Sequence, residues 1–477
     1  MPPSEQPKSG AVRQFQAPKG TRDFYPADLL RRRYVEKAWR DTSVRHGFEE
    51  IDGPTFEDLE LYTVKSGEGI VSEIFGVFSG KDEAELTALK ETGQAPYALR
   101  PEFTPTLARM YAARAAQLSR PTKWFWQQNC FRAERPQRGR LREFGQWNVD
   151  LIGDDSPDAD AEVIATCVGL LASLGLTPAD ARVRYSHRRV LATLLSRLGV
   201  GDEHLGAAFV LLDRREKLAD DDLEAMAFEF GLTGGDFIAF LKRPRGRAGL
   251  TQLLEHVPAG TESLDLTAML KALEAELAAA GIAEWCEPDF NIVRGLAYYT
   301  GMVFEVHEAG GGERAIAGGG RYDNLIQTFG GPATPAVGFG MGDVVLSLVV
   351  QDRGRMPQGA ELLERLSEPS ASLRPDVFVI SNGQPESDAQ VKPLVAMLRR
   401  GGGRTGETPV LHGVRPLHAR HSYKATRNIG KLLQEASGAH ARFAAIVENA
   451  GEVTLKDLDS GKQARVPLAE VAARVGG

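Results

Sequence analysis

Hydrophobic and polar residues near the start of the chain follow first a helical period and then a strand-like one. Over residues 26–46 the larger apolar side chains recur at near-helical spacing, which predicts a helix: Leu29, Leu30, Tyr34, Ala38 and Trp39. The next segment, residues 48–54, predicts a strand that a Gly-Pro pair ends. Residues 1–18 are polar and contain prolines, so we expect them to form a flexible lead.

Between Trp124 and Gly153 the period changes to two residues, which is typical of β-strands. The pattern predicts a strand over 124–132, a charged loop over 133–142 and a returning strand over 143–152. Successive side chains of a strand lie on opposite faces of its sheet. The returning strand therefore has one mainly polar face and one apolar face: Phe144, Gln146, Asn148 and Asp150 against Trp147, Val149 and Leu151.

A Leu/Ala-rich helical pattern extends from about residue 181 to 285, interrupted by a basic turn at 242–247, and we interpret it as an inserted helical unit. Strand-like sequence follows over 290–307, and then come two Gly-rich stretches, 310–320 and 330–342.

The carboxy-terminal part of the chain shows a different organisation. Residues 353–375 contain Pro and Ser with little periodicity, which predicts a linker. Beyond it, alternating strand and helix patterns predict a small α/β domain over 376–477. Its expected elements are a strand at 376–380, helices at 389–400 and 419–437, and a strand at 443–447.

The 477 residues are enough for roughly three domains of about 150 residues. Such a length supports a large core without a metal or disulfide staple. With 42% apolar and 25% charged residues, the composition excludes wholesale disorder, collagen and coiled coil. No apolar run is long enough for a membrane-spanning helix, and residues 1–19 lack the apolar segment of a secretory signal.

The three cysteines, Cys130, Cys167 and Cys286, lie far apart and form no CxxC pair. This spacing favours neither a disulfide framework nor a zinc cluster, so we expect no bound metal and a reducing, cytoplasmic location.

Net charge is −7, but residues 374–477 carry 15 Lys and Arg against 10 Asp and Glu, a local +5 that leaves −12 for the remainder. A polyanionic partner would then be held partly at the carboxy-terminal end, although such residues can also simply solvate a surface.

The charged loop carries the most informative chemistry. Five arginines fall within eleven residues, and the planar arginine fork suits phosphate oxygens: Arg132, Arg135, Arg138, Arg140 and Arg142. Together with the polar strand face, this hairpin could hold a triphosphate beside an amine-bearing substrate. The spacing of these residues alone is also compatible with a charged loop that only contacts solvent, next to an ordinary sheet surface.

Several ordered motifs carry a family resemblance. Phe131-Arg-x-Glu134, followed by Arg140 and Phe144, resembles motif 2 of class II aminoacyl-tRNA synthetases. The form Arg-Pro-Gln-x-Gly-Arg-x-Arg-Glu-Phe is similar to that of histidyl-tRNA synthetases in particular. Four further segments resemble elements of that family: 19–23, 291–305, 317–323 and the anticodon-binding sequence 421–430.

The resemblance implies a fold and a reaction. The fold would be an α+β catalytic domain on an antiparallel sheet over 19–352, with the helical insertion and a carboxy-terminal α/β anticodon-binding domain. Histidine would attack the α-phosphate of ATP, accompanied by Mg²⁺, and the acyl group of the adenylate would pass to the 3′ end of histidine tRNA. Because residues 48–54 resemble motif 1, the resemblance also implies a homodimer.

Residue by residue, the resemblance assigns Arg132 to the α-phosphate and the histidine carboxylate, Glu134 to the adenine amine and Arg140 to the outer phosphates. Arg294 would stabilise the pentavalent phosphate. The substrate amino group and the imidazole would be held by the remaining positions: Glu102, Thr104, Gln146 and Asp150 for the amine, and Tyr298, Tyr299 and Tyr322 for the ring.

For tRNA, the resemblance places Arg135 and Gln137 against the top of the acceptor stem, while the basic carboxy-terminal domain would read the anticodon. One alternative is a non-charging paralogue that senses histidine for a biosynthetic transferase; such proteins usually lack an anticodon-binding domain. A binding-only RNA module would not need so many active-site residues.

The chain departs from the family pattern at two positions. Ala297 occupies the place of an aspartate in the histidine-specific motif. Val345 stands where motif 3 usually supplies an arginine to the γ-phosphate, and this change is the one feature that favours the sensor. Arg140 or another cation, with Mg²⁺, would then have to cover that charge.

Overall fold

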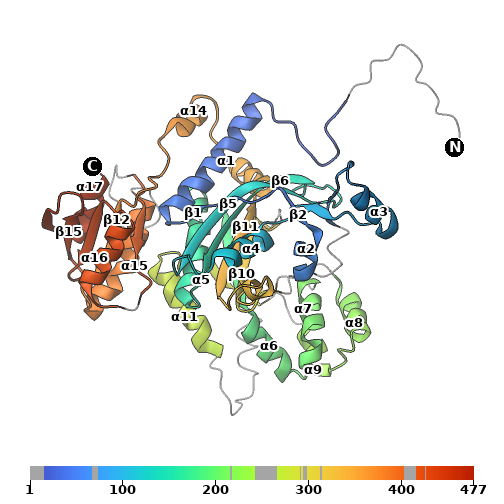
Figure 1. Ribbon diagram of the computed structural model, residues 1–477. Helices are drawn as coiled ribbons and strands as arrows, with labels where there is room; N and C mark the ends of the chain where they lie inside the picture. Colours follow the sequence, from blue (N-terminus) through green and yellow to red (C-terminus); the bar gives the residue numbers. More distant parts are fainter. Residues whose placement is uncertain are drawn as a thin grey trace.

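The computed structural model describes residues 15–66, 73–214, 218–241, 266–290, 292–293, 298–311, 314–401, 415–424 and 426–476. Its largest element is an eight-stranded sheet in the order β1-β5-β6-β11-β10-β9-β7-β8 (Figure 1). The outer pairs β1/β5 and β7/β8 are parallel, and the inner pairs are antiparallel. The strands are β1 (Glu49–Glu50), β5 (Thr122–Phe131), β6 (Glu143–Ile152), β7 (Ala181–His187), β8 (Cys286–Pro288), β9 (Met302–Glu308), β10 (Ala317–Arg321) and β11 (Ala336–Gly342).

Helices cover one face of this sheet and bury the largest core cluster. This cover consists of α1 (Pro26–Arg45), α5 (Pro157–Ser173), α13 (Asp343–Asp352) and α11 (Leu266–Ala279). Trp147, Val149 and Leu151 of β6 point into this core, where Trp39 and Trp147 stack at 6.2 Å between ring centroids. The other face carries a smaller cluster formed with α4 (Thr104–Arg114) and α12 (Leu325–Thr328).

Two smaller units flank the sheet (Figure 1). Near β5, a three-stranded sheet of order β2-β4-β3 combines β2 (Phe56–Asp58), β3 (Gly76–Val77) and β4 (Tyr97–Leu99) with α2 (Leu59–Ser66) and α3 (Glu83–Thr92). Following β7 come α6 (Arg188–Arg197), α7 (Leu205–Arg214), α8 (Asp220–Glu229) and α9 (Gly235–Leu241).

The carboxy-terminal domain has its own five-stranded sheet, β13-β12-β14-β15-β16, in which β13, β12 and β14 run parallel. After α14 (Gly359–Ser367), its elements are β12 (Val377–Ser381), α15 (Pro385–Arg400), β13 (Ala419–His421), α16 (Ile429–Gly438), β14 (Phe443–Val447), β15 (Glu452–Asp457), β16 (Gln463–Pro467) and α17 (Val471–Gly476). The architecture confirms the expected α+β region on a mainly antiparallel sheet, followed by a small α/β domain.

Several element predictions are confirmed, and others need correction. The first helix, both strands of the 124–152 hairpin, and the strand near 376–380 lie where the pattern put them. Helical structure from residue 181 is wrong for the first seven residues, because β7 alternates buried and outward side chains and joins the main sheet. Within 290–307, only Met302 onward is strand among the described residues.

Three further predictions were too coarse. The predicted linker 353–375 contains α14, which packs against α1. The predicted helix 419–437 begins as β13, paired with β12, and becomes helical only at Ile429. The predicted strand 48–54 is reduced to Glu49–Glu50, with Ile51 still donating its amide to the Phe125 carbonyl at 3.0 Å.

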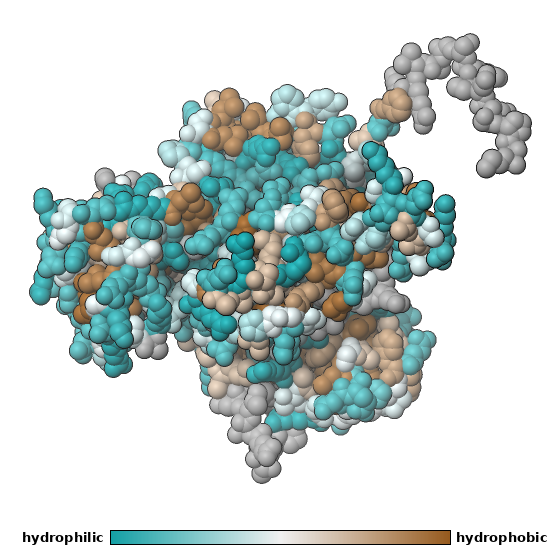
Figure 2. All heavy atoms as spheres, in the orientation of Figure 1, coloured by the Kyte–Doolittle hydropathy of each residue, from teal (hydrophilic) through white to brown (hydrophobic). Residues whose placement is uncertain are grey.

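The face of the molecule in Figure 2 is mostly hydrophilic, with hydrophobic residues gathered in small patches. Among the described helices, none combines the length and the apolar character that a bilayer crossing requires. The basic turn predicted at 242–247 lies outside the described residues.

Candidate functional site

A cavity of about 800 Å³ opens on the sheet face opposite the large core, within the size range of small-molecule sites. It is bounded by β6, β9, β10 and β11, by the end of the β5–β6 hairpin loop, and by the segment after residue 298. Nine of the site residues expected from the sequence line it: Glu102, Thr104, Arg132, Arg140, Gln146, Asp150, Tyr298, Tyr299 and Tyr322.

Strand β6 supplies the polar wall of the cavity. Its alternation places Phe144, Gln146, Asn148 and Asp150 on the cavity side, as the sequence pattern predicted. The side chain of Asp150 is almost completely buried, and Gln146 donates from Nε2 to Asn148 Oδ1 at 2.7 Å. This pairing fixes the orientation of the Gln146 amide.

Glycines in the neighbouring strands leave room for these side chains. Gly338 of β11 lies opposite Asp150 of β6, and a Cβ on Gly338 would stand 2.0 Å from Asp150 Oδ1. A Cβ on Gly320 would come within 2.9 Å of the Tyr299 ring. The Gly-rich strands therefore allow the Asp150 carboxylate and the Tyr299 ring to pack directly against the backbone of the sheet.

Three tyrosines gather around Asp150. The Tyr322 hydroxyl donates to Asp150 Oδ1 at 2.5 Å. The Tyr298 ring lies 4.6 Å from that of Tyr299 and 6.1 Å from that of Tyr322, between centroids. Burial, and then the charge of Asp150, raise the pKa of Tyr322 well above its ordinary value, so the phenol stays protonated and acts as a donor.

Arginines from the hairpin form the cationic part of the lining. Arg132 donates from Nε to the Pro101 carbonyl at 3.1 Å, and its guanidinium lies 5.0 Å from the centroid of the Phe144 ring. Arg140 forms an ion pair with Glu134. The carboxylate expected to meet adenine therefore holds the arginine expected to meet the outer phosphates.

Other predicted residues lie elsewhere. Arg135 and Gln137 are exposed at the hairpin turn, where the Gln137 and Arg140 backbones exchange hydrogen bonds of 3.0 and 2.9 Å. Neither residue lines the cavity. Arg294 and Ala297 lie outside the described residues. Val345, the departure in motif 3, does line the cavity.

Three ionisable lining residues were not predicted from the sequence: Glu305, His307 and Arg314. Glu305 and His307 alternate along β9 with the buried Phe304 and Val306, and the two polar side chains approach each other at 2.9 Å. This period-two signal was present in the sequence. For Arg314 no local pattern marks the position, because its place depends on how β10 pairs with its neighbours.

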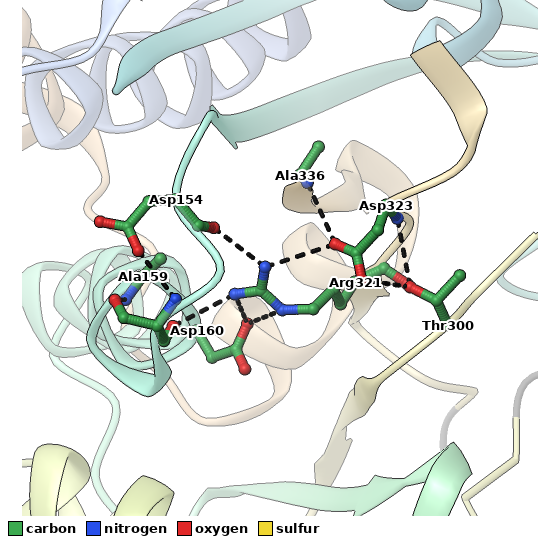
Figure 3. A network of polar contacts seen from close by, with 8 residues as sticks. Asp154, Ala159, Asp160, Thr300, Arg321, Asp323 and Ala336 are labelled. Carbon is green, nitrogen blue, oxygen red and sulfur yellow. Dashed lines mark hydrogen bonds and ion pairs between the residues drawn. The ribbon is translucent and has the colours of Figure 1, made fainter. Parts of the chain in front are cut away.

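A buried network of polar contacts beside the cavity holds the chain next to Tyr299 and Tyr322 in place (Figure 3). Arg321 donates to Asp160 Oδ1 at 2.6 and 2.9 Å and to the Asp154 carbonyl at 2.9 Å. Asp323 accepts from the Thr300 hydroxyl at 2.8 Å, and Thr300 in turn accepts from the Asp323 amide at 3.1 Å. Burial disfavours the charge of Arg321, but Asp160 and Asp323 outweigh that effect and raise its pKa.

The chemistry of the lining suits a zwitterion beside a polyphosphate. Carboxylates and hydroxyls can accept from an ammonium group or hold a heterocycle, while arginines can bind phosphate oxygens. Across the described ranges, no group of three or more His, Cys, Asp or Glu side chains gathers in a way that could hold a metal ion.

Comparisons with known proteins agree on one family. A family model described as histidyl-tRNA synthetase matches residues 20–342. A protein named histidine–tRNA ligase from Opitutus terrae is 42% identical over 348 residues, covering 72% of this chain and 76% of that protein. Another of the same name, from Natronomonas pharaonis, is 37% identical over 462 residues and covers 94% of this chain and 95% of its own length.

A solved structure agrees at the level of the fold. The crystal structure of histidyl-tRNA synthetase from Nostoc sp. PCC 7120 superposes with a TM-score of 0.57 at 24% identity, covering 97% of this chain and 99% of that one.

Proposed function

The chain belongs to the histidyl-tRNA synthetase family, and from this premise we propose that it is a histidine–tRNA ligase. It activates histidine with ATP to histidyl-adenylate and pyrophosphate, and then transfers the acyl group to the 3′ end of histidine tRNA. The observation that carries the proposal is a single cavity lined both by the carboxylates Glu102 and Asp150 and by the arginines Arg132 and Arg140.

For the nucleotide, we propose that Arg132 binds the α-phosphate and the histidine carboxylate. Glu134 meets the adenine amine and Arg140 the outer phosphates, which requires the ion pair between these two side chains to open when ATP enters. Arg294 stabilises the pentavalent α-phosphate. Mg²⁺ arrives with ATP as part of the substrate. Such a site acts by alignment and by stabilising charge in the transition state.

For the amino acid, Glu102, Thr104, Gln146 and Asp150 bind the α-amino group in this proposal. Tyr298, Tyr299 and Tyr322 hold the imidazole. Support comes from the Tyr322–Asp150 hydrogen bond, which ties a ring-binding group to an amine-binding group. A site that bonds both ring nitrogens rejects other amino acids, because its buried polar groups would then be left unpaired.

For tRNA, Arg135 and Gln137 contact the top of the acceptor stem, and the carboxy-terminal domain reads the anticodon. The exposure of both side chains at the hairpin turn supports the first assignment, and the net positive charge of residues 374–477 supports the second. The non-charging sensor is not better supported, since the relatives described above are named as ligases.

The proposed domain division keeps a lead over 1–18, a catalytic region over 19–352 with its helical insertion within about 181–285, a linker region over 353–375 and an anticodon-binding domain over 376–477. Because β7 belongs to the main sheet, the insertion itself would begin after His187. The three cysteines are all free, which supports a reducing, cytoplasmic location.

We also propose a homodimer formed through the region of residues 48–54. Large hydrophobic side chains on β2, on α2 and directly after β3 are exposed and would be covered by a partner: Phe56, Val64 and Phe78. Sedimentation of the purified chain at about twice its monomer mass would support this assembly, and sedimentation as a monomer at micromolar concentration would contradict it.

The decisive experiment is histidine-dependent exchange of labelled pyrophosphate into ATP, followed by charging of histidine tRNA. We expect both activities. Exchange without charging would remove the tRNA part of the proposal, whereas histidine binding with no exchange would favour the sensor. Arg294→Ala should nearly abolish exchange, and a full rate in that variant would contradict the role given to Arg294.

A further inference from the structure

The end of β11 lacks a cation where the family usually has one. Val345, in the first turn of α13, lines the cavity and is only 7% exposed. Two residues earlier, the buried Asp343 accepts from Arg22 at 2.7 Å and from the Gly145 amide at 2.9 Å. Arg22 is therefore engaged by a carboxylate and does not line the cavity.

Strand pairing brings Arg314 to this same place. β10 pairs antiparallel with β11, with Ala317 opposite Met341 and Gly318 opposite Gly340. Moving three residues back from Ala317 reaches Arg314, and the same step forward from Met341 reaches Val344. Arg314 therefore stands level with the start of α13, and it lines the cavity together with Val344 and Val345.

The surroundings of Arg314 are cationic. Arg132 and Arg140 line the same cavity. The pKa of Arg314 is lowered by burial first and then by Arg140, while Glu134 raises it in part and Arg132 lowers it further. Arg140 is partly neutralised by Glu134, but in the part of the chain that the structure describes no carboxylate lies within ion-pairing distance of Arg314. Three arginines around one cavity repel one another until an anion enters.

We propose that Arg314 binds the terminal phosphates of ATP, supplying from the segment just before β10 the positive charge that Val345 cannot supply from α13. This inference rests on the proposed function and deepens it by naming a phosphate-binding residue. The family resemblance assigns no role to position 314. Because the cation comes from the segment that leads into the neighbouring strand β10, the chain can carry valine in motif 3 and remain an ATP-dependent ligase.

The first test compares Arg314→Ala with Arg365→Ala. Arg365 lies on α14, is exposed and pairs with acids of its own helix region, so it is a matched control. In pyrophosphate exchange, Arg314→Ala should raise the KM for ATP by about 10- to 100-fold, the range of one charge-assisted hydrogen bond, and leave the KM for histidine within about twofold. Arg365→Ala should change neither constant.

A binding measurement separates a phosphate contact from a structural effect. By calorimetry, Arg314→Ala should weaken ATP binding by the same factor and leave AMP binding unchanged, because AMP lacks the outer phosphates. Equal losses for ATP and AMP, or an unchanged affinity for ATP, would overturn the inference.

Moving the cation back gives a further test. The double variant Arg314→Ala, Val345→Arg restores an arginine at the usual motif 3 position and should regain most of the lost ATP affinity. No recovery in a double variant with native circular dichroism would contradict the claim that the two positions serve the same phosphates. Absence of exchange in the unsubstituted chain would instead defeat the proposed function, while the ATP and AMP affinities would still test Arg314.

Discussion

Asp150 occupies the most constrained position in the cavity. It is almost completely buried, Tyr322 donates to its Oδ1, and Gly338 beneath it leaves no space for even one methyl group. A buried carboxylate is costly unless hydrogen bonds or opposite charges compensate for lost hydration. The phenol supplies part of that compensation, and the ammonium group of a substrate would supply more.

Tyr322→Phe removes the donor while keeping the ring in its core position. We expect the KM for histidine in pyrophosphate exchange to rise about 10- to 100-fold, because a hydrogen bond to a charged group contributes roughly 1.5–3 kcal/mol. The KM for ATP should change little. Tyr111→Phe is the matched control, since Tyr111 is equally buried but packs on Trp124 away from the cavity. An unchanged KM for histidine would contradict the role of Tyr322.

At the scale of residues, the sequence predicted what depends on local period. The two-residue alternation put Gln146 and Asp150 on one face of a strand, and the structure confirms that face. It could not predict the pairing of Glu134 with Arg140 or the place of Arg314. The first depends on how the hairpin loop folds back at the Gln137–Arg140 bridge, and the second on how β10 pairs with β11. In both cases a charged side chain gives the same local signal whether it faces solvent or a cavity.

At the scale of elements, the buried Arg321 connects β10 to α5. Its guanidinium bonds Asp160 and two backbone carbonyls near the start of α5, and Asp323 links the same segment to Thr300 (Figure 3). The residues between these anchors include Tyr322, and Tyr299 directly precedes Thr300. The network therefore sets the positions of cavity residues without touching a substrate.

Arg321→Ala should lower the free energy of unfolding by about 3–5 kcal/mol, because it leaves the buried Asp160 without its partner. Urea denaturation measures this loss. The double variant Arg321→Met, Asp160→Leu removes both charges and should recover most of the stability. If the double variant were less stable than Arg321→Ala, the cost would not come from an uncompensated carboxylate.

Element prediction failed where tertiary pairing decided the structure. β7 carries a strand alternation, with Val183 and Tyr185 inward, but it is followed directly by Leu-rich helices that dominated the pattern. β13 has only three residues and is held in place by its parallel pairing with β12. α14 is amphipathic but lies between prolines and serines. In contrast, α1 has 20 residues and the strands of the β5–β6 hairpin have ten each, so these long elements could be predicted from their own sequence.

At the scale of the molecule, a buried charge cluster joins the main sheet region to the carboxy-terminal domain. Glu162 of α5 accepts from Lys123 of β5 at 2.6 Å and from Arg399 of α15 at 2.8 Å. Arg399 also approaches His46 Nδ1 at 3.2 Å. Arg399 and Lys123 lower the pKa of Glu162 well below its ordinary value against the effect of burial, so the carboxylate stays charged.

Buried histidines make the stability of this arrangement depend on pH. Burial lowers the pKa of His46 to about 4 and that of His418 to about 3, both from an ordinary value of 6.5. As pH falls below 6.5, the unfolded chain takes up protons that the folded chain does not, so stability falls by up to about 1.4 kcal/mol per pH unit for each histidine. The loss ends once pH passes the folded-state pKa.

We therefore expect the melting temperature to drop between pH 7 and pH 5, as measured by calorimetry. His46→Gln keeps an acceptor for Arg399 but cannot titrate, so its melting temperature should depend less steeply on pH. His204→Gln, at a histidine of the helical unit whose side chain is 41% exposed, should keep the slope of the parent. Identical slopes for all three proteins would show that His46 is not a source of the dependence.

Glu162→Gln tests whether the cluster couples the two domains. The amide cannot neutralise the two buried cations, and breaking a buried ion pair lowers the free energy of unfolding by about 3–5 kcal/mol. Lys123 can relieve part of this loss by losing its proton, because burial already lowers its pKa to about 8. The cavity lies on the opposite face of the sheet from α5, so pyrophosphate exchange should change little. Charging needs both domains on one tRNA, so its rate should fall at least tenfold as the contact between the carboxy-terminal domain and the main sheet region weakens.

Glu361→Gln, at an exposed acid on α14, is the control and should leave both activities intact. Equal losses of exchange and charging in Glu162→Gln would mean that the cluster supports the catalytic sheet itself and not the placement of the carboxy-terminal domain.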